Sequence, residues 1–367
     1  MRRLPAEWEP QSAIMLTWPH EQTDWRDDLE RVHALWAGLT TTIGRYEPVL
    51  LVGHDPEHAE LARSMALAAG ARPERLWLAS APSDDSWARD HGPITVLDGD
   101  TPILVDFGFN GWGRKYPHAR DDAINRHLHA AGVLGDRPME PGGIVLEGGA
   151  IESDGAGTLL AVERTVRDPM RNPGLGLGAI EAILAERLGI RHFLWLANGR
   201  ISGDDTDGHI DTLARFCDPR TICYLRCDDP SDPDFPGLQA MESELRGLRD
   251  PGGRPYRLIP LPSPAPVIET GGTHRGERLP AGYANFLILN GAVLVPTYAD
   301  PADARAMGII GRLFPGREVI GLDCRPLIRR GGSLHCVTMQ LPGQMLVHRE
   351  ASSPGQIAEP KNRRLHR

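Results

Sequence analysis

The stretch "ANFLILNGAVLVPTYADPADARAMGIIGRLFPGREVIGL", residues 284–322, indicates the fold class because it contains one complete supersecondary unit. Two apolar runs flank Asn290-Gly291, a dipeptide that strongly predicts a β-hairpin. The segment "PADARAMGIIGRLF" then predicts a helix, and "REVIGL" predicts a further strand. The resulting order of strand, strand, helix and strand is typical of an α/β protein.

A similar order of elements occurs near the N-terminus. "SAIMLTW" predicts a strand, residues 27–46 carry apolar side chains at alternating steps of three and four, and "EPVLLVG" predicts the next strand. An additional helix is expected at residues 56–69. Three more helices are expected to begin near Asp121, Gly178 and Pro236, each between apolar strand-like runs. The last four of the five main helices begin at similar intervals, and the first gap is wider because it holds the additional helix, which indicates repeated supersecondary units.

The chain of 367 residues is expected to form a single domain over residues 1–345, because no Ser/Gly linker or charge block divides it. Residues 346–367 are charged and lack apolar periodicity, which predicts a disordered basic tail. The N-terminus lacks the apolar core of a signal peptide, and no apolar run reaches membrane-spanning length. We therefore expect a cytoplasmic protein without a membrane partner.

The net charge argues against a protein that binds nucleic acid, and the cysteine content argues against one that is stabilised by disulfides. The net charge of −9 is opposite to that of a surface that binds nucleic acid, so no nucleic-acid partner is expected. Five cysteines form an odd set without the spacing of a disulfide framework, so free thiols are expected.

Four short segments collect reactive side chains beside glycines or prolines, each where one strand-like run ends or another begins. They are "DDSWARDHGP" (84–93), "LEGGAIESDG" (146–155), "GDDTDGHID" (203–211) and "GGSLHC" (331–336). Loops at strand ends, held by a rigid scaffold, are where functional sites are usually built.

The acidic segment 203–211 looks like a metal-ligand cluster, but its spacing does not fit one. With Gly208 as the glycine of a calcium loop, Ala214 would stand where the bidentate glutamate belongs. No second His or Cys pair lies nearby at zinc spacing, so we expect no metal site. An aspartate-rich turn is the commoner role for any one of these acids. His209 and Asp211 differ, because their spacing on a predicted strand would place an acid–base group and a carboxylate on one side.

Trp87, Asp90 and Glu147 are candidate binding residues in two of the other segments. Tryptophan offers a flat face to a planar cation, and a carboxylate offers an edge to paired N–H donors. Glu147 precedes glycines that let the backbone approach a ligand. The alternative is a core role for Trp87, as expected for the other tryptophans, and a solvated pair of Asp90 with Arg89. "GLGLGA" (174–179) mimics a dinucleotide fingerprint, but it follows no strand, so we expect only the start of a helix.

Cys336 and His209 with three carboxylates, Asp90, Glu147 and Asp211, form an unusual set. A Cys–His pair alone suggests a cysteine peptidase, but a surplus of acids would repel an attacking thiolate. The acids suit a cationic substrate such as a guanidinium, which is planar, always charged and carries N–H donors in a fork that matches carboxylates. Two acids gripping it would leave its central carbon open to the sulfur, and the bound cation would favour the thiolate.

The motifs "DSWARD", "LEGG", "DDTDGHID" and "GGSLHC" occur in the order found in the agmatine deiminases and the related bacterial peptidylarginine deiminases. The chain resembles these members of the guanidino-group-modifying superfamily from "PAEWEPQSAIMLTWPH" to "GGSLHCVTMQLP". The resemblance implies a five-bladed α/β propeller of pseudo-repeated ββαβ units, the pentein fold, around a central site. It also implies a homo-oligomer, specifically a dimer, and no metal or organic cofactor.

The same resemblance implies catalytic roles for five positions. Cys336 matches the nucleophile, and His209 matches the general acid/base. Asp90 and Asp211 match the pair that holds the guanidinium, and Glu147 matches an acid near the histidine.

Four further positions are expected to bind or frame the substrate. By resemblance, Trp87 matches an aromatic wall of the site, and Gly331 and Gly332 match the bend that presents the thiol. Asp205 is our candidate partner for the distal ammonium of agmatine.

The expected reaction is hydrolysis of agmatine to N-carbamoylputrescine and ammonia, a step in putrescine and polyamine synthesis, through a thiouronium-type intermediate on the cysteine. Peptidylarginine or free arginine is the alternative substrate, and free arginine would need a partner for its α-carboxylate, with Arg89, Arg114 and Arg200 as candidates. An amidinotransferase, a non-catalytic guanidine-binding protein and a metal-dependent hydrolase are weaker alternatives.

Overall fold

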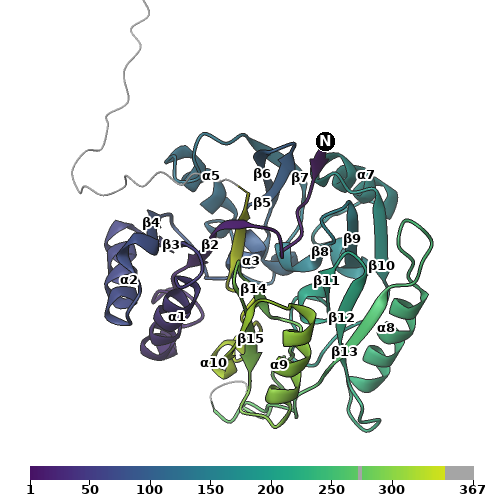
Figure 1. Ribbon diagram of the computed structural model, residues 1–367. Coiled ribbons are helices and arrows are strands. Elements are labelled where there is room, and N and C mark those ends of the chain that lie inside the picture. Colours follow the sequence, from purple (N-terminus) through teal and green to yellow (C-terminus); the bar gives the residue numbers. More distant parts are fainter. Residues whose placement is uncertain (272–274, 344–367) are drawn as a thin grey trace, which may run out of the picture.

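The computed structural model describes residues 1–271 and 275–343, which form five β-sheets of three or four strands. Figure 1 shows the sheets arranged around a common centre, with the longer helices on the outside. Each sheet pairs two strands antiparallel, and a helix then leads to a third strand that runs parallel to the second. This is the predicted ββαβ unit, repeated five times.

The units follow one another along the chain. The first contains β5 (Ile94–Asp98), β6 (Thr101–Gly108), α5 (Ile124–Ala130) and β7 (Met139–Val145), with β1 (Arg2–Arg3) added at the edge of its sheet. The second contains β8 (Ile151–Ser153), β9 (Thr158–Val162), α7 (Leu177–Leu188) and β10 (His192–Leu196). The third contains β11 (Ala214–Asp218), β12 (Thr221–Arg226), α8 (Phe235–Gly247) and β13 (Arg257–Pro262). The fourth contains β14 (Leu287–Ile288), β15 (Ala292–Thr297), α9 (Ala302–Leu313) and β16 (Glu318–Asp323).

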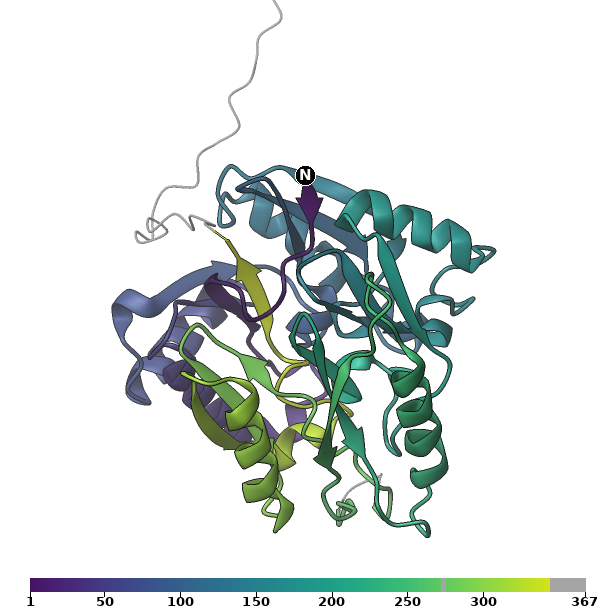
Figure 2. The same cartoon turned by 45° about the vertical axis from the view of Figure 1, so that its right-hand side comes forward.

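The fifth unit is assembled from both ends of the chain and closes the ring. It contains β17 (Met339–Pro342), β2 (Gln11–Thr17), α1 (Leu29–Ile43) and β3 (Val49–Gly53), followed by α2 (Pro56–Ala68) and β4 (Leu76–Ser80). β17 pairs antiparallel with β2, with Met339 opposite Met15, and Figure 2 shows the yellow C-terminal strand beside the purple N-terminal segment. The loop that carries Cys336 is therefore fixed by a strand directly after it.

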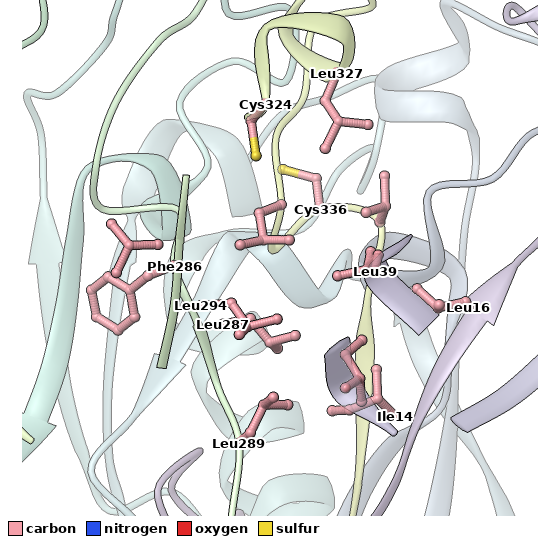
Figure 3. Close-up of a cluster of buried hydrophobic side chains, with 14 of the residues drawn as sticks. Ile14, Leu16, Leu39, Phe286, Leu287, Leu289, Leu294, Cys324, Leu327 and Cys336 are labelled. Atoms are coloured by element: carbon pink, nitrogen blue, oxygen red, sulfur yellow. The ribbon is translucent and has the colours of Figure 1, made fainter. Parts of the chain in front are cut away.

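Apolar side chains fill the space between the sheets. Figure 3 shows one such cluster, to which β2 contributes Ile14 and Leu16 and the fourth sheet contributes Leu287 and Leu294. Cys336 lies at the edge of this cluster, so the loop of the candidate nucleophile packs directly on the core. Burial of such residues supplies most of the folding free energy and makes the loop positions around the centre rigid.

The structure confirms the predicted longer helices and the free state of the five cysteines, all of them buried. The GLGLGA segment begins α7, as expected. The 3-10 turns η1 (Arg26–Asp28) and η3 (Asp121–Ala123) lead into α1 and α5, where helices were expected to begin. Other short helical turns were not predicted: α3 (Ala88–His91), α4 (Gly111–Arg114), α6 (Glu163–Val166), α10 (Arg325–Ile328), η2 (Pro73–Arg75), η4 (Gly148–Ala150) and η5 (Ile210–Thr212).

One local prediction is wrong. Residues 209–211 do not form a strand, because His209 caps the 3-10 turn η5, which precedes β11. The predicted tail, residues 346–367, lies outside the described residues. Within residues 1–271 and 275–343, no helix is long and apolar enough to cross a membrane.

Candidate active site

The loop before β17 places Cys336 at the centre of the ring. Gly331 adopts φ of 85°, a left-handed conformation that glycine reaches without strain and other residues rarely adopt. Gly332 faces the indole of Trp87 so closely that a β-carbon there would lie 2.2 Å from the ring. The backbone path that leads to the thiol therefore favours glycine at both positions.

A cavity opens onto this thiol. Its lining combines six residues predicted for the site with five others: Trp87, Asp90, Asp205, Gly331, Gly332 and Cys336, and Asp24, Trp112, Tyr116, Thr206 and Arg330. The remaining predicted residues, Glu147, His209 and Asp211, are buried and do not line this cavity. His209 and Asp211 nevertheless lie close to its lining, as the distances below show.

Asp90 is held in place on the short helix α3. Its Oδ2 accepts a hydrogen bond of 2.9 Å from Trp112 Nε1, and its Oδ1 accepts one of 3.0 Å from the backbone N–H of Gly149. Burial raises the pKa of Asp90 to about 6, and the charges of Asp211 and Glu147 act in the same direction. These two hydrogen bonds fix the direction of the Asp90 carboxylate. The neighbouring His209 is the cation that favours its ionisation.

His209 lies between two of the predicted carboxylates. Its Nδ1 is 3.6 Å from Asp90 Oδ1, and its Nε2 is 3.8 Å from Glu147 Oε2. Neither ring nitrogen has a hydrogen-bond partner among residues 1–271 and 275–343. Burial lowers the pKa of His209, but the carboxylates of Asp90, Glu147 and Asp211 outweigh it and raise the pKa to about 9. The imidazole is therefore protonated at neutral pH.

Glu147 follows β7 and is anchored by a buried arginine. Arg171 Nε donates to Glu147 Oε1 and Oε2 at 2.8 and 3.1 Å. Burial raises the pKa of Glu147, but its interaction with His209 and the charge of Arg171 outweigh it, so the pKa falls below its usual value. Glu147 is thus an ionised partner for the charged imidazole.

Asp211 lies next to the Cys336 thiol, behind the lining of the cavity. Asp211 Oδ2 lies 3.9 Å from Cys336 Sγ and 2.7 Å from His335 Nδ1, while its Oδ1 is buried without a partner in the described part of the chain. Asn285 Nδ2 lies 3.3 Å from the sulfur. Burial, together with the charges of Asp211 and Asp90, raises the pKa of Cys336 well above its usual value. Without a bound cation the thiol is therefore protonated.

The mouth of the cavity carries a second acidic position. Asp205 accepts a hydrogen bond of 2.8 Å from the hydroxyl of Tyr116, and burial raises its pKa. Trp112 and Tyr116 pack edge to face, with ring centroids 5.6 Å apart. The lining of the cavity thus combines the carboxylates of Asp90 and Asp205 with the aromatic side chains of Trp112 and Tyr116.

Several of these neighbours were not found from the sequence. Trp112 was expected in the core; it is buried, but it also lines the cavity and binds Asp90. Asn285 was part of a predicted apolar strand, although it lies just before β14 and touches the thiol. Trp112 has φ of 54° and lies between two glycines that also have positive φ, so the three residues form an unusual turn. The glycines are visible in the sequence, but apolar periodicity alone does not predict this turn.

Arg89 does not line the substrate cavity, so it is not a partner for a substrate carboxylate there. Its side chain is 5% exposed, pairs with Glu7 at 3.1 Å and lines a different cavity. The arginine that does line the substrate cavity is Arg330, which the sequence reading did not single out.

No group of three or more His, Cys, Asp or Glu side chains within residues 1–271 and 275–343 is arranged to hold a metal ion. The aspartates of segment 203–211 have separate partners: Asp204 accepts from the backbone N–H groups of Thr206 and Gly208 at 2.9 and 2.8 Å, and Asp207 pairs with Lys115 and Arg171. These bonds explain the acidic composition that resembled a metal loop.

A ring of five ββαβ units around a thiol, a charged histidine and several carboxylates is the arrangement of the enzymes that modify guanidino groups. The chain belongs to the Porphyromonas-type peptidyl-arginine deiminase family, whose sequence model matches residues 3–342. It is accordingly a deiminase, a hydrolase acting on C–N bonds of amidines.

Similar proteins agree with this assignment. The agmatine deiminase of Stutzerimonas stutzeri is 34% identical over 358 residues, which cover 92% of this chain and 95% of that protein. A crystal structure from Porphyromonas gingivalis, described as a putative arginine deiminase, is 48% identical with a TM-score of 0.86 and covers 95% of this chain and 100% of that one. The agmatine deiminase of C. jejuni with substrate bound is 32% identical with a TM-score of 0.84, covering 94% of this chain and 97% of that one.

Proposed function

We propose that this protein is an agmatine deiminase that converts agmatine and water to N-carbamoylputrescine and ammonia through a covalent intermediate on Cys336. The observation that carries the proposal is the shared cavity, whose lining includes the Cys336 thiol and the carboxylates of Asp90 and Asp205. Agmatine carries a positive charge at each end, and this cavity has a carboxylate for each.

The inner end suits a guanidinium. Asp90 lines it, and Asp211 lies behind the lining with Oδ2 at 3.9 Å from Cys336 Sγ and Oδ1 as a buried acceptor without a partner in the described residues. An unpaired buried acceptor is costly, and an N–H group of the substrate would satisfy it. The bound cation would also offset the two carboxylate charges that keep Cys336 protonated, so thiolate formation depends on substrate binding.

The reaction then proceeds in two steps. The Cys336 thiolate forms a C–S bond to the guanidinium carbon, and the C–N bond to one terminal nitrogen breaks as protonated His209 donates its proton to the departing ammonia. An S-alkylthiouronium remains on the enzyme. His209, now neutral, removes one proton from a water molecule, and the new C–O bond forms as the C–S bond breaks and the thiolate leaves. The remaining hydroxyl proton passes to solvent or to the released ammonia as the carbonyl of the ureido product forms.

A second candidate substrate is free arginine, or arginine at the C-terminus of a peptide. Arg330 lines the same cavity, and its side chain forms no ion pair or hydrogen bond with the described residues. A guanidinium in that position would attract a substrate carboxylate and repel the second ammonium of agmatine. The balance between Asp205 and Arg330 therefore decides between the two substrates.

Parallel assays of ammonia release test both candidates. Agmatine, free arginine and a peptide ending in arginine are compared in wild-type protein, Asp205→Asn, Arg330→Gln and Cys336→Ala. We expect the wild type to prefer agmatine, Asp205→Asn to raise KM for agmatine about tenfold, and Cys336→Ala to be inactive. A preference for free arginine that disappears in Arg330→Gln would instead establish the second candidate.

Three further features belong to this proposal: a single deiminase domain over residues 1–345, assembly as a homodimer, and a cytoplasmic location. Light scattering during gel filtration tests the assembly, and cell fractionation tests the location.

A further inference from the structure

A network of charged side chains lies behind the candidate nucleophile, and none of its members lines the substrate cavity. The members come from separate segments of the chain: Glu7, Arg89, Glu152, Asp211, Arg215 and His335. Only Asp211 has a role in the mechanism above. Removing the other five charged groups from water costs desolvation free energy, which is consistent with a role for them in the site.

His335 is the central member of this network. Its side chain is 1% exposed, and its two ring nitrogens contact opposite partners: Nδ1 lies 2.7 Å from Asp211 Oδ2, and Nε2 lies 2.9 Å from Glu7 Oε1. The backbone N–H of His335 also donates to Asn285 Oδ1 at 2.8 Å. The ring therefore has no freedom to turn.

The partners of His335 determine where its proton sits. Nδ1 faces a carboxylate, which can only accept, so Nδ1 must be the nitrogen that carries hydrogen. Nε2 lies near both an acceptor, Glu7, and a donor, Arg215 Nη2 at 3.2 Å, so it keeps a partner with or without a proton. Donation from Nδ1 to Asp211 is thus preserved in both protonation states of the ring.

This donation fixes how Asp211 is presented. Oδ2 is occupied by the imidazole and lies 3.9 Å from Cys336 Sγ, which leaves Oδ1 as the buried oxygen without a partner in the described residues. Burial raises the pKa of Asp211, but the hydrogen bond from His335 outweighs it and keeps the carboxylate ionised. Asp211 can therefore offer one free, charged oxygen to a substrate N–H.

Glu7 links His335 to two other segments of the site. Its carboxylate binds Arg89 at 3.1 Å and Arg215 at a shorter distance, in addition to His335. Arg89 immediately precedes Asp90, His335 immediately precedes Cys336, and Arg215 lies four residues after Asp211. One carboxylate near the N-terminus therefore joins the three segments that carry the thiol and the two acids of the guanidinium pair.

We propose that Glu7 and His335 are positioning residues of this active site: Glu7 holds the imidazole of His335, and His335 turns Asp211 so that one oxygen faces the guanidinium. Neither residue touches the substrate. They act through Asp211 and through the loop that presents Cys336, and the N-terminal segment thereby completes a site whose other members lie far along the chain.

Two substitutions of His335 separate a positioning role from mere packing. In His335→Asn the amide nitrogen takes the place of Nδ1 and still donates to Asp211, whereas in His335→Gln it takes the place of Nε2 and contacts Glu7 instead. We expect kcat to stay within about tenfold of wild type in His335→Asn and to fall about 100-fold in His335→Gln, the cost of a hydrogen bond to a charged group. Glutamine is nearer to histidine in size, so loss of packing predicts the opposite order.

A second measurement does not depend on turnover. The pH dependence of Cys336 alkylation by iodoacetamide, with Cys336→Ala as background, reports the pKa of the thiol. The groups that act on the network around it are Asp211, Asp90, Glu7, Arg89, Arg215 and His335. We expect the thiol pKa to rise in His335→Gln, because the charge of Asp211 is no longer shared with an N–H donor, and to be unchanged in His335→Asn.

Glu7 is tested beside a matched control in the same segment. Glu9 forms an ion pair with Arg3 at 2.6 Å that does not join the network, so Glu9→Gln should keep wild-type kinetics. Glu7→Gln should lower kcat about tenfold or more, with partial recovery in Glu7→Asp. Equal kinetics in Glu7→Gln and Glu9→Gln, or equal effects of His335→Asn and His335→Gln on both kcat and the thiol pKa, would overturn the proposal.

The proposal rests on the proposed function only through the choice of assay substrate. If the wild-type protein does not hydrolyse agmatine, the proposed function fails, and the order of thiol pKa values among the variants still decides whether His335 positions Asp211.

Discussion

The indole of Trp87 occupies the space that a side chain at Gly332 would need, since a β-carbon at 332 would lie 2.2 Å from Trp87 Cζ3. The Trp87 ring cannot move away, because Trp25 packs against it with ring centroids 5.5 Å apart and because Trp87 Nε1 donates to Asp85 at 3.2 Å. The cavity wall and the thiol loop are therefore in direct contact, and each sets the position of the other.

Gly332→Ala should accordingly damage both the site and the fold. The added methyl group forces Trp87 or the thiol loop to move, which we expect to lower kcat/KM at least tenfold and to cost about 1–3 kcal/mol of stability. Steady-state assays and thermal unfolding measure the two effects. Gly237→Ala is the matched control, because a β-carbon at Gly237 meets no atom within 4 Å in helix α8. Equal activity of the two variants would show that the contact is not required.

Asp90→Asn should nearly abolish turnover while the protein remains folded. The substrate cation loses one of its two inner charge partners in a buried site, for which we expect a loss in kcat/KM on the order of 1,000-fold. Circular dichroism and the unfolding midpoint check the fold. Asp323→Asn removes an exposed carboxylate paired with Arg325 and should leave the kinetics unchanged. Normal substrate affinity in Asp90→Asn would count against the guanidinium clamp.

The pH profile of kcat/KM should have two limbs. Asp90, with a pKa that burial raises to about 6, must be ionised to bind the cation, so activity falls as pH drops through about 6. His209 must be protonated to assist the departing ammonia. Burial lowers its pKa, but the carboxylates raise it to about 9, so activity falls again above about 9. A rate that rises continuously through pH 9 would instead indicate control by thiol ionisation in the free enzyme.

The sequence predicted the elements of this fold better than their closure. Apolar residues at helical spacing in α1 and the Asn290-Gly291 turn before β15 are local signals, and both are confirmed. The pairing of β17 with β2 joins residues more than 300 positions apart. No local pattern encodes such a contact, so ring closure was reached through family resemblance alone.

The sequence predicted the candidate reactive residues of the site better than the neighbouring residues that hold them in place. Cys336, Asp90 and Asp205 line one cavity as expected, because reactive side chains beside glycines are visible in a sequence. Asn285 was hidden inside a predicted apolar strand, and Trp112, which stands between two glycines, was assigned to the core. The turn η5, which directly follows His209, carries Asp211 where a strand was predicted. The side chains of Thr206 and Asp204 accept hydrogen bonds from the backbone N–H groups of His209 and Gly208, which shapes the loop that leads into this turn.

Chelator treatment separates the thiol mechanism from a metal-dependent hydrolase. Because the described residues hold no group arranged for a metal ion, ammonia release from agmatine should be unchanged after dialysis against EDTA. Restoration of a lost activity by added Zn²⁺ or Mn²⁺ would contradict this expectation.

The central claim is that a sulfur–carbon bond forms at Cys336, and peptide mass spectrometry of acid-quenched reactions tests it most directly. Acid quenching within the first turnover traps the intermediate before water displaces the sulfur, since His209 takes part in both its formation and its hydrolysis. In wild-type protein mixed with agmatine, we predict an amidine-derived adduct on the peptide that contains Cys336, and none in Cys336→Ala. An adduct on another residue, or turnover that survives in Cys336→Ala, would contradict the account.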